Sequence, residues 1–187
     1  MIGRWRIRSL RARLIGAALL GLSISMALLG AAIETAHSAS VNAARVERQI
    51  AQLYGLIAEA EESSLGLTLP IEVADPQLNQ LESGRFAGVV DKRGKVIWAS
   101  ASTALLSENW IAAARESMLA FGVPSSWSVD DRAGTLIGQK VAIRWQTSML
   151  EADYTFLVFE VAEEAMAEAA AFRQQLIWWL AGAVVAV

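Results

Sequence analysis

Twenty consecutive residues, Leu14 to Ile33, carry no charge. As an α-helix with a rise of about 1.5 Å per residue they would be roughly 30 Å long, which matches the hydrocarbon core of a bilayer. The five charged residues ahead of them are all arginines, and the first acidic residue is Glu34. Because positive charge keeps its end of an apolar segment in the cytoplasm, we predict a cytoplasmic N-terminus (residues 1–13) followed by a transmembrane helix (residues 14–33).

The sequence ends with a second apolar stretch, residues 176–187. Twelve residues are too few to cross a bilayer, so we interpret this stretch as the start of a second, truncated transmembrane helix. Residues 34–175 would then form an extracytoplasmic domain between two membrane helices. A cleaved signal peptide is the alternative for the N-terminus, but the apolar part of such peptides usually has about 7–15 residues.

Beyond its first thirteen residues the chain is acidic, with 11 basic and 19 acidic residues. This balance disfavours nucleic acid as a partner and favours cations. The absence of cysteine excludes disulfides, thiolate–zinc sites and cysteine nucleophiles. The one histidine, His37, provides neither a zinc site nor a Ser-His-Asp triad. A pH-sensing role for His37 is conceivable, but a solvated side chain is the simpler interpretation.

Apolar residues past the first apolar segment recur at heptad-like spacing, which predicts that the helix continues to about Ser63. This seam would pack either on the domain or on a second copy of the chain. Arg45, Arg48, Gln49 and Gln52 are assigned to the other faces. The seam residues are Ala39, Ala43, Val46, Ile50, Leu53, Ile57 and Ala60.

A β-hairpin is predicted from Phe86 to Ala99, with Gly94 supplying the positive φ of the turn. Ser107 would cap a helix that ends near Phe121 and buries Ile111, Ala114, Met118 and Phe121. Further strands are predicted at Trp127–Val129, Lys140–Trp145 and Tyr154–Val161. The strand Lys140–Trp145 alternates, which predicts a half-buried strand with Val141, Ile143 and Trp145 on the inner face and Lys140, Ala142 and Arg144 on the outer face. The last strand should be central, because it is apolar on both faces except at Glu160. These elements predict an α+β fold, a mixed or antiparallel sheet of about five strands against a long N-terminal helix.

From Ala162 onward, helix-forming residues predict an outer helix that runs into the second apolar stretch. Glu163, Glu164 and Glu168 lie at its start, where Glu164 and Glu168 share one face and repel each other. They are the candidates for binding Mg²⁺ or Ca²⁺ as a signal. The simpler interpretation is that negative charge stabilises the beginning of the helix.

Four tryptophans in the predicted domain could line a ligand pocket, although a role in the core is the simpler interpretation. They are Trp98, Trp110, Trp127 and Trp145. The sequence indicates no catalytic and no cofactor-binding residue, so no reaction is predicted for the chain itself.

Several segments together resemble the periplasmic sensor region of PhoQ-like two-component sensor histidine kinases. They are Arg8-Ser9-Leu10-Arg11-Ala12-Arg13-Leu14, Gln52-Leu53-Tyr54, Leu67-Thr68-Leu69-Pro70, Gly84 to Asp91, Gly94 to Ser100, Tyr154-Thr155-Phe156 and Phe172 to Leu176. The resemblance implies a PAS-like (PDC) periplasmic domain, a homodimer, contact with membrane lipid and a location in the bacterial inner membrane.

The resemblance also implies a cytoplasmic kinase half, which uses ATP and a cognate response regulator and is not part of this sequence. In some sensors of this kind, divalent cations bridge an acidic, membrane-facing surface to lipid phosphates. Two alternatives remain open: the sensor domain of a chemoreceptor or another transmembrane receptor, and a membrane-tethered periplasmic binding protein without a kinase.

Overall fold

The computed structural model describes residues 10–63, 66–115, 120–146, 151–162 and 174. The chain divides into two units, residues 1–41 with 169–187 and residues 42–168. The predicted second membrane segment, residues 176–187, lies outside the described residues.

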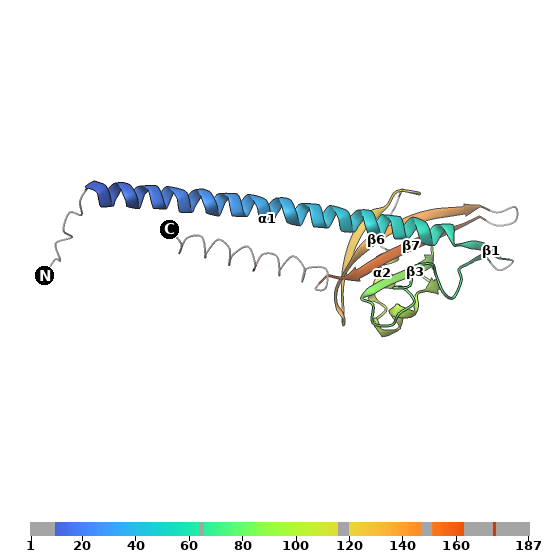
Figure 1. Cartoon of the computed structure of the whole chain (residues 1–187). Helices are drawn as coiled ribbons and strands as arrows, with labels where there is room; N and C mark the ends of the chain where they lie inside the picture. Colours follow the sequence, from blue (N-terminus) through green and yellow to red (C-terminus); the bar gives the residue numbers. More distant parts are fainter. Residues whose placement is uncertain (1–9, 64–65, 116–119, 147–150, 163–173, 175–187) are drawn as a thin grey trace. The chain divides into compact units, whose positions relative to one another are not determined.

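One long helix, α1 (Leu10–Ala58), begins the described chain (Figure 1). Its apolar side chains in the first unit are open to the surroundings, for example Leu20 at 65% exposure. Among the described helices, α1 is the one long and apolar enough to cross a membrane. This agrees with the membrane segment predicted at residues 14–33 in length and composition.

The predicted end of this helix, near Ser63, is wrong. Helix α1 ends at Ala58, and Glu61–Ser63 is a short strand, β1, paired antiparallel with β2 (Gly66–Thr68). Pairing with β2 gives the backbone of β1 hydrogen-bond partners that another helical turn would otherwise provide.

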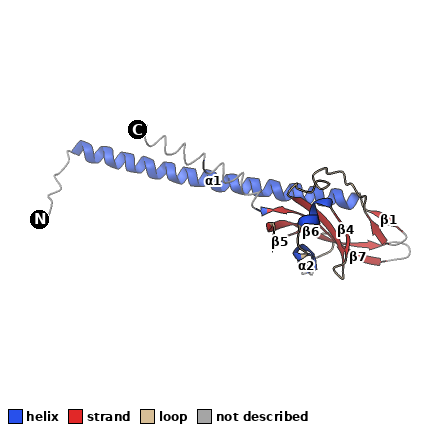
Figure 2. Ribbon diagram, turned by 90° about the horizontal axis from the view of Figure 1, so that it is seen from below, coloured by secondary structure: helices blue, strands red, loops and turns tan. Residues whose placement is uncertain are grey.

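The second unit contains a five-stranded sheet, and every pair of neighbouring strands in it is antiparallel. The strand order is β4-β3-β7-β6-β5, so the first hairpin lies at one edge of the sheet. Strand β7 is in the centre, as predicted. Figure 2 shows the strands in red and the helices in blue. The strands are β3 (Arg85–Asp91), β4 (Val96–Ala99), β5 (Ser125–Asp131), β6 (Gly134–Gln146) and β7 (Glu151–Val161).

The hairpin between β3 and β4 turns where it was predicted to turn. Gly94 has φ +81°, a backbone conformation that residues with a Cβ rarely adopt. Asp91 Oδ1 accepts hydrogen bonds at 2.8 Å from the backbone N–H groups of both Arg93 and Lys95. The turn is therefore fixed by a glycine and by one carboxylate.

Two short helices, η1 (Ala101–Leu105) and α2 (Asn109–Arg115), follow this hairpin. The prediction that α2 reaches Phe121 is wrong in part, because the described helix ends at Arg115 and Phe121 lies in a turn at 46% exposure. Of the predicted buried face, Ala114 is buried and Ile111 is partly buried, whereas Phe121 is exposed and Met118 lies outside the described residues. The other buried residues of α2 are Trp110 and Ala113. Lys140 was expected on the outer face of its strand but is buried, and its Nζ donates to the Ala113 carbonyl at 2.6 Å.

Apolar side chains cover both faces of the sheet in the second unit. On the α1 face, Leu53 and Leu56 of α1 pack with Val89, Val141 and Phe156. On the α2 face, the core cluster contains Trp110, Trp127, Leu136, Leu157 and Phe159. Because both faces are covered, β7 is buried on both sides, which is why its sequence lacks the polar–apolar alternation of a half-exposed strand.

Candidate functional site: the α1–sheet pocket

A cavity of about 340 Å³ lies between α1 and the β5–β6 hairpin, entirely within the second unit. We call it the α1–sheet pocket. The wall that α1 provides is mostly polar. The floor, which β5 and β6 provide, contains both polar residues (serine and glutamine) and apolar residues. The lining residues are Asn42, Arg45, Val46, Gln49, Ser126, Trp127, Ser128, Ile137, Gly138 and Gln139.

Strand register explains which side chains form the floor. Ser126 pairs with Gln139, and Ser128 pairs with Ile137. Side chains of paired residues lie on one face of a sheet and alternate along each strand, so these four share the α1 face with Val141. Trp127 and Gly138 are in the opposite phase, and the Trp127 ring packs on Phe159 in the α2-side core with 5.1 Å between ring centroids. Trp127 therefore borders the pocket through its backbone.

Gln49 is the most unusual residue in this wall. Its side chain is only 3% exposed, and its Nε2 has no hydrogen-bond partner among the described residues. A buried polar group left without a partner costs about 1–3 kcal/mol of stability. A buried, unpaired amide beside a cavity is what a binding site for a hydrogen-bonding ligand needs.

The sequence had placed Gln49 on an outer face of the helix, and this prediction is wrong. The buried stripe of α1 is Gln49, Leu53 and Leu56, while Ala39 and Ala43 of the predicted seam are exposed. Both stripes have the 4,3 spacing of a helix face and share Leu53, so spacing alone does not choose between them. Gln49 lies next to the predicted stripe in sequence and was assigned to solvent because its side chain is polar.

In the floor of the pocket, unlike at Gln49, the buried amide has a hydrogen-bond partner. Gln139 is 4% exposed, and its Nε2 donates to Ser126 Oγ at 2.7 Å. This bond joins β6 to the edge strand β5 and holds the Gln139 amide in place.

Three arginines surround one buried carboxylate next to the pocket. Glu160 is 8% exposed and lies on β7, where Ile137 of the pocket floor is its strand partner. Its Oε1 lies 3.8 Å from Arg45 Nε, and its Oε2 lies 3.3 Å from Arg48 Nη2 and 3.9 Å from Arg85 Nε. Three positive charges around one negative charge leave this region electropositive.

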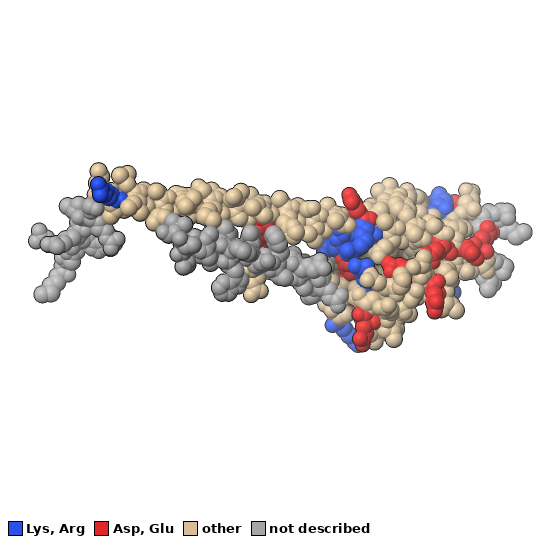
Figure 3. Space-filling model, viewed as in Figure 1, with Lys and Arg blue, Asp and Glu red and all other residues tan. Residues whose placement is uncertain are grey.

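Figure 3 shows the resulting basic patch beside α1. Arg45, which belongs to both the patch and the pocket, also donates a hydrogen bond to Asn42. Its 3.8 Å separation from Glu160 is an ion-pair distance and too long for a hydrogen bond. The sequence held one signal for this cluster, which is the single charge, Glu160, within the otherwise apolar segment Tyr154–Val161 of β7, because buried charges are normally paired.

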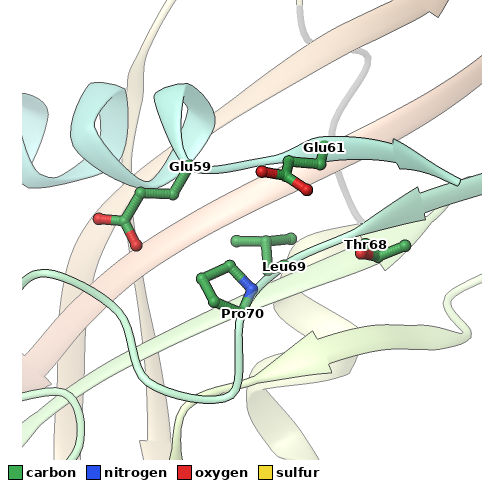
Figure 4. A pocket seen from close by; sticks show the side chains of 5 residues that line it. All are labelled: Glu59, Glu61, Thr68, Leu69 and Pro70. Carbon is green, nitrogen blue, oxygen red and sulfur yellow. The ribbon is translucent and has the colours of Figure 1, made fainter.

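A second cavity, of about 290 Å³, is lined by Glu59, Glu61, Thr68, Leu69 and Pro70. In Figure 4, the two glutamates project from the end of α1 and from β1, above Leu69 and Pro70. Both oxygens of Glu59 accept from the backbone N–H of Ala74, at 3.1 and 3.2 Å. That carboxylate therefore anchors the loop after β2, and the cavity is the weaker candidate for a site.

The predicted cation ligands, Glu163, Glu164 and Glu168, lie outside the described residues. Within residues 10–162 as far as the structure describes them, no group of three or more histidine, cysteine or acidic side chains is arranged to hold a metal ion. The four tryptophans considered for a ligand pocket divide between the two faces of the sheet. Trp110 and Trp127 belong to the α2-side core, while Trp98 and Trp145 pack half-buried on the α1 side.

Comparison with known proteins finds no matching family model, no matching curated protein and no matching solved structure. Function is therefore inferred from the geometry of the chain itself.

Proposed function

We propose that this chain is the signal-sensing input region of a bacterial membrane-bound two-component sensor histidine kinase, similar to the PhoQ-like type. The domain after the first membrane helix receives an extracytoplasmic stimulus and relays it to a cytoplasmic kinase outside this sequence. One observation carries the proposal. The single helix α1 contains the apolar stretch 14–33 and also forms one wall of the α1–sheet pocket.

The contacts of α1 in the second unit support a mechanical role. Leu53 and Leu56 pack into the sheet core, and Arg45 and Arg48 pair with Glu160 on the central strand. A ligand that alters the distance between α1 and the sheet would therefore change the position of the helix directly. Signalling requires two packings of the helix within a few kcal/mol of each other, with a different ligand affinity in each.

The proposal includes a PAS/PDC-like domain in the periplasm, anchored in the inner membrane and in contact with lipid. An antiparallel five-stranded sheet with α1 on one face and α2 on the other supports it. The proposal also includes a homodimer along α1, since small exposed residues recur at heptad spacing on that helix, namely Ala44, Ala51 and Ala58.

The relay is tested in a chimaera that joins residues 1–187 to the cytoplasmic half of a characterised sensor kinase. Inserting one alanine after Ser40 rotates the two parts of α1 by about 100° relative to each other. Inserting seven residues at the same place restores the phase to within about 20°. We expect the single insertion to change basal autophosphorylation and the seven-residue insertion to leave it near wild type. Equal output from both would contradict a relay through α1.

The coding sequence beyond Val187 tests the output. A completed membrane helix, a HAMP-like helix pair and a His-Glu phosphoacceptor helix are expected there. A different output domain would favour a chemoreceptor or another receptor, and a stop codon would favour a tethered binding protein. Either result would overturn the kinase assignment.

Divalent cations remain a candidate stimulus within this proposal. Replacing Glu163, Glu164 and Glu168 together by glutamine should abolish the response of the chimaera to Mg²⁺ or Ca²⁺. An unchanged cation response would contradict a role of these carboxylates.

A further inference from the structure

The geometry points to a small organic acid with hydroxyl or carbonyl groups as the ligand of the α1–sheet pocket. This inference deepens the proposed function and rests on it only for its signalling consequence, since binding itself can be measured on the isolated chain. Three properties of the pocket lead to this ligand class: its size, its charge and its unpaired hydrogen-bonding group.

The size of the pocket suits a small molecule. Ligand pockets in proteins usually measure about 300–1,000 Å³, and this cavity of about 340 Å³ is at the lower end of that range. It lies between α1 and the β5–β6 hairpin, and both of these contribute side chains to the core. A metabolite-sized ligand would therefore contact both walls at once and couple the helix to the sheet.

The charge of the pocket selects an anion. Arg45 lines the cavity, and Arg48 and Arg85 lie with it around Glu160. One carboxylate balances only one of the three guanidinium groups. A ligand carboxylate next to Arg45 would compensate a second positive charge and gain a charge-assisted hydrogen bond. The same excess of positive charge disfavours a metal cation in this pocket.

The hydrogen-bonding groups select an oxygen-rich ligand. Gln49 Nε2 is a buried donor without a partner among the described residues, and an acceptor oxygen on the ligand would satisfy it. Ser126, Ser128 and Asn42 add further polar groups around the cavity. A simple inorganic anion would meet Arg45 but would lack the extent needed to reach these groups together. A hydroxy acid meets both requirements.

Binding is measured by isothermal titration calorimetry on the purified 187-residue chain in detergent micelles. The probes are gluconate, malate and glutamate, with sorbitol as the neutral counterpart of gluconate and with acetate and inorganic phosphate as anions without the polar extension. We expect at least one of the three organic acids to bind, and to bind more tightly than sorbitol, acetate and phosphate.

Two variants assign the binding to this pocket. Gln49→Leu removes the unpaired amide and should weaken binding about tenfold, the equivalent of one lost hydrogen bond. It should leave the Tm unchanged or higher, because a buried unpaired group is removed. Arg45→Gln should weaken binding by about tenfold or more. The matched control is Gln52→Leu on the same helix, which loses a hydrogen bond to Asp75 and should lower the Tm while leaving binding within about twofold.

Each negative result has a defined meaning. Absence of binding by all three acids at millimolar concentration would overturn the inference, and so would binding that Gln49→Leu leaves intact. Tighter binding of phosphate than of every organic acid would overturn the inference in favour of a phosphate site. A chimaera that ignores a bound acid would instead contradict the sensory role, because the binding measurement is independent of any kinase.

Discussion

Arg48 on α1 donates a hydrogen bond to Glu160 on β7, with 3.3 Å between Nη2 and Oε2, although 112 residues separate them in the sequence. Arg45 and Arg85 approach the same carboxylate from α1 and β3. Glu160 is therefore the point at which three elements of the second unit are tied together by charge. It is also the only charged side chain among the buried positions of the central strand β7, all of which the structure describes.

Replacing Glu160 by glutamine should lower the free energy of unfolding by about 1–2 kcal/mol. The isosteric amide keeps the shape of the side chain but leaves three arginines without their counter-charge, and the partial exposure of these arginines limits the loss. Urea unfolding of the full chain in detergent measures the change.

The matched control is Glu151→Gln, which breaks an exposed pair with Arg144 at 3.2 Å. Exposed pairs contribute little, so a change within about 0.5 kcal/mol is expected. Equal losses for the two variants would contradict a special role of Glu160.

Gly88 and Trp110 are packed so closely that no side chain fits between them. A Cβ at Gly88 would lie 2.6 Å from Trp110 Cζ3. Gly88→Ala should therefore cost about 1–3 kcal/mol of stability through overpacking. Combining it with Trp110→Phe, which makes room, should recover part of the loss, and a double-mutant cycle of urea unfolding measures the coupling.

Gly55→Ala is the control for this glycine effect. Gly55 lies on α1, and apart from its chain neighbours and the adjacent turns of helix backbone, no atom among the described residues falls within 4 Å of a Cβ built there. In an open helical position alanine is favoured over glycine by about 0.5–1 kcal/mol, so this variant should be more stable than wild type. A loss of stability in Gly55→Ala would contradict this interpretation of both positions.

The sheet was predictable because its signals are local. The alternation from Lys140 to Trp145, the glycine turn of the first hairpin and the largely apolar segment Tyr154–Val161 each follow from short-range chemistry, and each predicted strand lies within an observed one. The observed strands β6 and β7 begin earlier than predicted, at Gly134 and Glu151. The ends of the helices were less predictable. The end of α1 is set by the pairing of β1 with β2, a contact that helix propensity does not contain.

The candidate site was not predicted, because it depends on which face of α1 is buried. Gln49 and Leu56 complete the buried stripe around Leu53, and only the sheet beneath the helix selects this face. Lys140 shows the same limitation. A lysine in an alternating strand was assigned to solvent, whereas α2 covers it and provides the Ala113 carbonyl as its acceptor.

Asp131 should make the stability of the domain depend on acid pH. Burial raises the pKa of this carboxyl, but hydrogen bonds from the Ser107 hydroxyl and from the backbone of Ala133, Ser107 and Arg132 outweigh it, so the pKa is lowered overall. In the unfolded chain an aspartate titrates near 3.9. The stabilisation is therefore complete above about pH 4 and is lost as the pH falls below this value toward the folded pKa.

Asp131→Asn should be less stable than wild type at pH 7 and should show a flatter decline in the free energy of unfolding below about pH 4. Ser107→Ala removes the side-chain donor and should give an intermediate slope. Ser128→Ala, on the same strand β5, serves as the control and should keep the wild-type slope. Urea unfolding at a series of pH values measures all four proteins. A wild-type slope in Asp131→Asn would show that the acid sensitivity arises from other carboxyl groups, because the amide at position 131 has no proton to gain in this range.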